Sequence, residues 1–153
     1  MAHVLVALVA LSLMVQARPD FSGTWALDVR ESIGLNEDEQ ERGVTLRVRQ
    51  TDREVVFERR LNGGDSVRVV TYALDGSERT SKAGSQQVKA RSRWDGDRLV
   101  TKGTQSASVL FVRMSATFDE DRRLADNGKT MIAESVFVRD GKTTRRKLVF
   151  RRQ

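Results

Sequence analysis

The segment FSGTW, residues 21–25, decides how the rest of this chain is interpreted. It places a glycine two residues before a tryptophan, at the head of a strand-like stretch that ends near Asp28. A glycine allows a strand to bend sharply, and a tryptophan supplies a large apolar side chain that can close one end of a barrel. We therefore predict that residues 22–28 form the first strand of a small barrel, with Trp25 buried in its core.

The segments that follow residue 43 alternate apolar and polar side chains. Apolar residues occupy every second position from 44 to 48, and small or apolar residues do so from 88 to 94. Asn-Gly and Asp-Gly pairs, which tolerate the positive φ of tight hairpin turns, separate such segments at 62–63, 75–76, 95–96, 127–128 and 140–141. A period of two with these turns predicts consecutive antiparallel strands.

We expect an all-β fold, a single antiparallel meander β-barrel of about eight to ten strands. The expected strands lie near 22–28, 44–51, 54–61, 66–74, 86–94, 97–104, 107–118, 130–139 and 144–152. Closure into a barrel hides the edges of such a meander, whereas the alternative, a two-sheet sandwich, needs longer crossovers. The acidic segment RESIGLNEDEQERG, residues 30–43, has few β formers and predicts a short helix or loop between the first two strands.

The first 17 residues have the pattern of a secretory signal peptide. An apolar run at residues 4–15 ends in Val15-Gln16-Ala17, a small-residue cleavage pattern, and is shorter than the roughly 20 residues that a membrane-spanning helix needs. We therefore expect a signal peptide at 1–17 and one barrel domain at 18–153, in a periplasmic or secreted protein.

The composition after residue 17 excludes most familiar catalytic chemistry. The chain has no cysteine, its one histidine is His3, and its formal net charge is +6. Residues 18–153 therefore contain no Ser-His-Asp triad, thiolate nucleophile or imidazole metal ligand. We expect a non-catalytic protein without a metal or cofactor; an enzyme that uses only carboxylate, lysine or tyrosine groups is a third hypothesis.

The segment DFSGTWALD, residues 20–28, resembles the first strand of the calycin superfamily, which includes the lipocalins and the fatty-acid-binding proteins. The chain is most similar to exported bacterial lipocalin-like proteins, and RWDGDRLV at 93–100 resembles a hairpin of fatty-acid-binding proteins. The resemblance implies a barrel that holds a small hydrophobic or amphipathic ligand. It also implies that Arg151 or Arg152 of the last strand lies across Trp25. The Arg-x-Tyr that grips a carboxylate in fatty-acid-binding proteins is replaced here by Leu148 and Phe150.

The candidate ligand-binding residues lie on the inward parity of the expected strands. Within such a barrel these apolar and small side chains either surround a cavity or fill a solid core. We predict ligand contacts at Trp94, Ala90, Val88, Val112, Met114 and Phe150. Arg113 has the opposite parity to the apolar row at 110–118 and is expected to face solvent.

The basic residues suggest a second hypothesis. Lysines and arginines gather on the outward parity of several strands, where they either act as dispersed solubilising charge or bind an anionic membrane or envelope surface. In the second hypothesis the barrel is filled and the protein has a structural or envelope-interaction role. Nucleic acid is not an expected partner, because no aromatic residues alternate with the basic ones. We expect a monomer.

Overall fold

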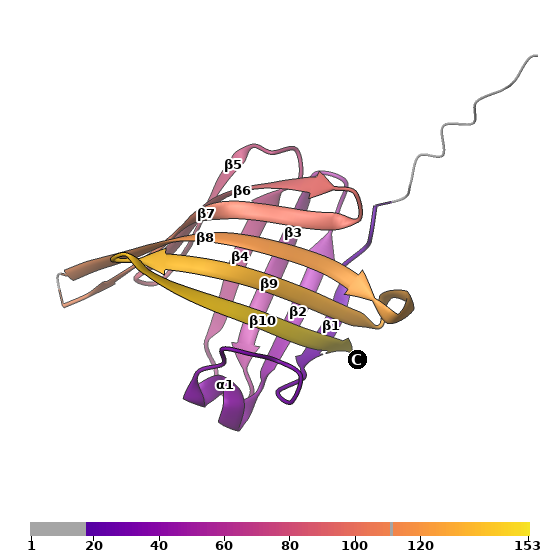
Figure 1. Cartoon of the computed structure of the whole chain (residues 1–153), viewed down its shortest axis with the longest axis horizontal. Helices are drawn as coiled ribbons and strands as arrows, with labels where there is room; N and C mark the ends of the chain where they lie inside the picture. The colour runs from indigo at the N-terminus through magenta and orange to yellow at the C-terminus, as the bar shows by residue number, and fades with distance from the viewer. Residues whose placement is uncertain (1–17, 111) are drawn as a thin grey trace, which may run out of the picture.

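The computed structural model describes residues 18–110 and 112–153, in which ten strands form one antiparallel sheet (Figure 1). The predicted signal peptide at 1–17 lies outside the described residues and stays a prediction. The strands are β1 (Gly23–Leu27), β2 (Val44–Gln50), β3 (Glu54–Leu61), β4 (Val67–Ala73), β5 (Glu78–Ala83), β6 (Gln86–Asp95), β7 (Arg98–Val109), β8 (Val112–Ala125), β9 (Thr130–Arg139) and β10 (Lys142–Arg152). Two short helical segments, α1 (Glu37–Arg42) and the 3-10 helix η1 (Asp126–Gly128), complete the described chain.

The sheet closes where the first strand meets the last. β1 lies between β2 and β10, with Trp25 opposite both Leu46 and Arg152, and every other hydrogen-bonded neighbour is consecutive in sequence. β4 and β5 are the two ends of the sheet and are joined by no ladder. The Thr71 N–H instead donates to the Ser81 hydroxyl across this seam, at 2.9 Å. The fold is therefore a nearly closed meander barrel.

The predicted fold class is confirmed, and so is the helix between the first two strands. Two boundary predictions are wrong. The segment at 78–83 forms β5, which was not predicted, and β7 and β8 meet at the pair Val109↔Val112 rather than near residue 105. β8 then continues to Ala125, through a charged stretch for which no strand was predicted.

One half of the barrel is filled. Trp25 is fully buried, donates from Nε1 to the Phe21 carbonyl at 2.9 Å, and lies under the Arg152 guanidinium, 4.2 Å from its ring centroid. This confirms Trp25 as a core plug and Arg152 as the arginine across it. Gly23 has φ +133°, a conformation that residues with a side chain rarely adopt, and a Cβ there would also lie 2.7 Å from Arg152 Nη1, so the backbone at this position favours glycine.

The short helix α1 is fixed to the barrel wall at its first turn. Asn36 caps the helix by accepting from the Glu39 N–H, and Glu39 accepts in return from the Asn36 N–H at 3.0 Å. The Glu39 side chain is buried, which orients the helix against β3 and β10.

No helix in the described part of the chain has the length and apolar character needed to cross a bilayer.

Candidate functional site

A cavity of about 620 Å³ occupies the half of the barrel that is not filled, at the end near the β7–β8 and β9–β10 turns. This volume lies within the range of roughly 300–1,000 Å³ that small-molecule sites occupy. Part of its wall is apolar and aromatic, because successive strands turn the same parity inward. The larger apolar lining residues are Leu46, Phe57, Val70, Val88, Met114, Phe118, Phe137, Leu148 and Phe150.

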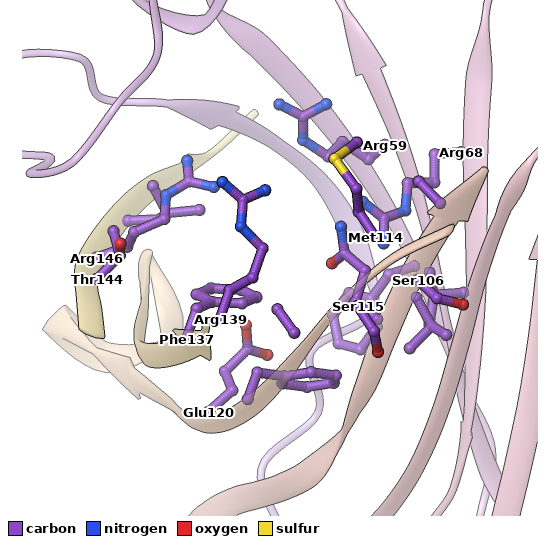
Figure 2. Close-up of a pocket in the computed structure, with 18 of the residues that line it drawn as sticks. Arg59, Arg68, Ser106, Met114, Ser115, Glu120, Phe137, Arg139, Thr144 and Arg146 are labelled. Carbon is purple, nitrogen blue, oxygen red and sulfur yellow. The ribbon is translucent and has the colours of Figure 1, made fainter. Parts of the chain in front are cut away.

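Charged side chains line the rest of the cavity and its mouth (Figure 2). The figure shows arginines from β3, β4, β9 and β10 projecting toward the same space. The mouth is open to solvent, since Asp140 and Lys142, which line it, are exposed. The charged lining consists of Arg59, Arg68, Glu120, Arg122, Arg139, Asp140, Lys142 and Arg146.

Inside the cavity, Arg122 is neutralised by its neighbour on the same face of β8. Its Nη2 donates to Glu120 Oε1 at 2.6 Å, and both side chains are largely buried. The guanidinium also lies over the Phe57 ring, 4.2 Å from the centroid, and contacts Met131 Sδ at 3.7 Å. Arg122 is therefore held in place by an ion pair and a cation–π contact, and its charge is already matched.

A second carboxylate pairs with two more cavity arginines. Glu39 of α1 accepts from Arg59 Nη2 through Oε1 and from Arg146 Nη2 through Oε2, each at 2.6 Å. Burial by itself would raise the pKa of Glu39, but the hydrogen bonds from Arg146 and the Asn36 N–H, with the charges of Arg146 and Arg59, lower it below its usual value. Glu39 thus ties α1 to β3 and β10 as a charged group.

Arg68 differs from these arginines, because no carboxylate in the described residues pairs with it. It lines the cavity from β4, and burial lowers its pKa by disfavouring the charged form. Tyr72 lies four residues along the same strand, and burial together with the nearby charge of Glu120 raises the pKa of its hydroxyl. An arginine remains protonated under these conditions, so the cavity contains a positive charge without a partner.

Three of the six predicted ligand-binding residues line the cavity. Val88 and Phe150 belong to its apolar wall, and Met114 lies at its mouth with 41% of the side chain exposed. Ala90 is buried on the inward face of β6, one step beyond the cavity lining and within the filled half. Their role as ligand contacts stays a prediction.

Trp94 and Val112 lie away from the cavity lining. Trp94 has the inward parity but is near the far end of β6, where it stacks on Phe21 with ring centroids 5.9 Å apart. Val112 is 62% exposed, because β8 extends past its neighbours at this end of the sheet. The prediction that the row 110–118 faces inward along its whole length is therefore wrong, although Arg113 is exposed as expected.

The sequence analysis missed the charged residues of the site. Glu120 and Arg122 lie two and four positions after Phe118 on the same strand, and they would have been found if the inward parity of β8 had been continued through DEDRRLA. Arg59, which the alternation leaves among apolar residues, does line the cavity. No sequence signal indicated that Glu39 of the helix would pair with two of the arginines that line it.

Comparison with known proteins gives a likeness in structure alone. No family model matches the chain. No curated protein matches it in sequence. Zebrafish ileal bile acid-binding protein complexed with cholic acid superposes with a TM-score of 0.61 at 12% identity, covering 87% of this chain and 98% of that one. Human cRBP IV has a TM-score of 0.55 at 16% identity, with 88% and 99% covered.

Secretory abundant heat soluble protein 4 from Ramazzottius varieornatus has a TM-score of 0.59 at 14% identity and covers 90% of this chain and 99% of that one. Sequence identities this low establish a common architecture and nothing finer. Together with the ten-stranded meander and the helix after β1, they show that this chain has the calycin fold, in the nearly closed form of the fatty-acid-binding proteins.

Proposed function

We propose that this protein is a non-catalytic carrier that holds one small amphipathic anion in the barrel. The apolar part of the ligand would lie against the aromatic wall, and its negative group would lie beside Arg68. The observation that carries the proposal is the cavity of about 620 Å³ in which Arg68 has no carboxylate partner among the described residues.

The apolar wall supports the first half of this proposal. Phe57, Phe118 and Phe137 line the cavity, and the last two stack with ring centroids 5.7 Å apart. A ligand covering these rings removes apolar surface from water, which stabilises the complex by about 25 cal/mol for each Å² buried. A filled barrel, as in the second hypothesis from the sequence, would leave no room for such a ligand.

The arrangement of charges supports the second half. Of the five arginines that line the cavity, Arg59, Arg122 and Arg146 already have carboxylate partners. A partly buried guanidinium without a partner favours an anion, because the anion restores the interaction that burial removes from the charged form. Arg68 is the unpaired arginine that reaches the cavity from β4, and Arg139 lies at the mouth.

The similar structures agree with a carrier of this kind. Their names include a bile acid-binding protein with cholic acid and a fatty acid transporter, both of which have ligands with an apolar body and an acidic group. The apolar run at 4–15 and the cleavage pattern at 15–17 support the further proposal that this carrier is exported.

Native mass spectrometry of the gently purified protein tests the proposal. We expect a bound mass of a few hundred daltons, either as purified or after exposure to a lipid extract. Clean apo protein after such exposure would contradict it.

Variants then test the position of the negative group. Arg68→Gln should weaken binding of a fluorescent naphthalene sulfonate by roughly tenfold, which is the loss of one charge-assisted hydrogen bond. Arg47→Gln, which removes an exposed charge from the outside of β2, is the matched control and should leave the affinity unchanged. Equal affinities for the two variants would place the negative group elsewhere.

A further inference from the structure

The hairpin of β7 and β8 projects from the barrel as a two-stranded ribbon (Figure 1). The ladder between β6 and β7 ends at Gln86↔Ala107, and the ladder between β8 and β9 begins at Thr117↔Val138. Between these limits the described residues of β7 and β8 form ladder pairs only with each other, as at Val109↔Val112. The end of the hairpin therefore stands clear of the sheet.

This projecting end is apolar and exposed. We use "ribbon tip" for Val109, Leu110 and Val112, whose side chains are 52%, 87% and 62% exposed. Eight large apolar side chains are exposed in the described residues, and five of them, including Met114 and Val138, lie on this hairpin or the adjacent end of β9. A cluster of this kind on a protein surface marks a contact site, because single exposed apolar residues are otherwise scattered.

Cations without a carboxylate partner in the described residues lie on the ribbon and at the turn near its base. Arg113 is on the ribbon itself, and Arg139 and Lys142 flank the neighbouring β9–β10 turn. None of the three has a carboxylate partner within 18–110 and 112–153, and the acid in that turn is Asp140. Exposed apolar side chains with cations beside them are complementary to a bilayer that carries anionic lipids. They are a poor match for an apolar protein surface without carboxylates, which would leave the cations unpaired.

The ribbon tip is continuous with the mouth of the cavity. Met114 and Ser115, which follow Val112 on β8, line the cavity, and so do Arg139 and Lys142. A surface that covers the ribbon tip therefore also faces the mouth. For a lipid surface, this arrangement lets an amphipathic molecule move between bilayer and barrel with little exposure to water.

We propose that the ribbon tip inserts into the surface of an anionic lipid bilayer, with Arg113, Arg139 and Lys142 at the level of the lipid headgroups and the cavity mouth facing the membrane. This docking goes beyond ligand binding in the barrel. The two proposals can be tested independently, because vesicle binding can be measured whether or not the cavity is occupied.

Cosedimentation of the purified protein with vesicles tests the docking. We expect binding to vesicles of phosphatidylcholine with phosphatidylglycerol, weaker binding to phosphatidylcholine alone, and weakening in high salt. A variant with Val109→Ser, Leu110→Asn and Val112→Ser should bind anionic vesicles at least roughly tenfold more weakly. Asn is chosen because the backbone at position 110 has φ +45°, which asparagine tolerates.

Two control variants match these changes away from the ribbon tip. Ile33→Ser removes a comparably exposed apolar side chain from the segment between β1 and α1, and should bind vesicles as the unchanged protein does. Loss of two cations by Arg139→Gln with Lys142→Gln should weaken anionic binding. The same loss at the far end of the barrel, by Arg93→Gln with Lys129→Gln, should weaken it much less, although the net charge is equal.

A tryptophan reporter locates the contact. Leu110→Trp should gain a blue-shifted emission and quenching by brominated lipids, whereas Asp97→Trp, in the β6–β7 turn at the opposite end, should gain neither. Vesicle binding that is unchanged in the triple variant, or absent in the unchanged protein, would overturn the docking. The docking would also be overturned if the unchanged protein were a dimer and the triple variant a monomer, because a second copy of the chain would then cover the ribbon tip. The triple variant should bind a cavity ligand in solution as tightly as the unchanged protein does. If neither the unchanged protein nor any variant bound such a ligand, the carrier proposal would fail and the docking proposal would not be affected.

Discussion

The guanidinium of Arg122 lies over the ring of Phe57, 4.2 Å from its centroid, inside a barrel whose other buried contacts are mainly apolar. The contact joins β8 to β3 across the interior, and Glu120 completes it by accepting from the same guanidinium. Part of the cavity wall is thus held together by the Arg122 guanidinium, which contacts an aromatic ring and a carboxylate at the same time.

Removing the charge of Glu120 should destabilise the fold. Glu120→Gln leaves the largely buried Arg122 without its anion, and we expect a loss of about 2 kcal/mol in the free energy of unfolding at neutral pH. Urea denaturation followed by circular dichroism measures this. Glu58→Gln, which breaks the exposed pair with Arg49, is the control and should cost less than about 1 kcal/mol. Equal losses would show that the cavity pair has no special role.

Glu39 should make the stability of the protein depend on pH. Its pKa in the folded protein is below the usual value of 4.5, so its contribution is fully present above about pH 4.5 and is lost as the pH falls through the lower folded pKa. Glu39→Gln should therefore lower the free energy of unfolding by about 2 kcal/mol at pH 7 and by progressively less in acid. Glu41→Gln, on the exposed face of α1, should change neither value. A difference between Glu39→Gln and the unchanged protein that stays constant from pH 7 to acid would contradict this account.

Gly103 should not accept a side chain. A Cβ at this position on β7 would lie 2.6 Å from Ala90 Cβ and would also collide with the Lys89 carbonyl oxygen on the adjacent strand. We expect Gly103→Ala to lower the free energy of unfolding by about 2 kcal/mol, measured by thermal or urea denaturation. Gly84→Asn, at a turn position with open space and a φ of +58°, should be close to neutral.

Trp94 should matter for stability and not for ligand binding. Because it stacks on Phe21 away from the cavity lining, Trp94→Ala should leave the ligand affinity measured by calorimetry unchanged and cost about 2 kcal/mol of stability. Met114→Ala, at the mouth, should weaken binding with little effect on unfolding. If Trp94→Ala bound the ligand more weakly, Trp94 would be a ligand contact, as its position in the sequence suggests.

Much of this architecture follows from the sequence, because hydrophobic alternation and Gly-containing turns specify local strands. The missed strand β5, ERTSKA, is at one end of the sheet and is mostly exposed, so it has no apolar alternation to recognise. The second half of β8 was missed for a different reason. Its inward charges, Glu120 and Arg122, neutralise each other inside the barrel, and a sequence pattern shows the charges without the pairing.

The candidate site was harder to predict than the fold. Parity states which face of a strand a residue occupies, but not how far along the barrel it lies. Val88, Ala90 and Trp94 share a face of β6, yet Val88 lines the cavity, Ala90 is in the filled half and Trp94 is at the opposite end. Val112 also has the inward parity, but its strand extends beyond the neighbours that would cover it.

The seam between β4 and β5 determines how this barrel can change its girth. Elsewhere, moving two adjacent strands apart would break a row of backbone hydrogen bonds, whereas at the seam the Ser81 hydroxyl spans the space to Thr71 in place of a ladder. Separating β4 from β5 would break side-chain contacts, namely the Ser81 bridge and the Arg79–Glu54 ion pair, and would leave every backbone ladder intact, so the seam is where the girth of the barrel can change at the least cost.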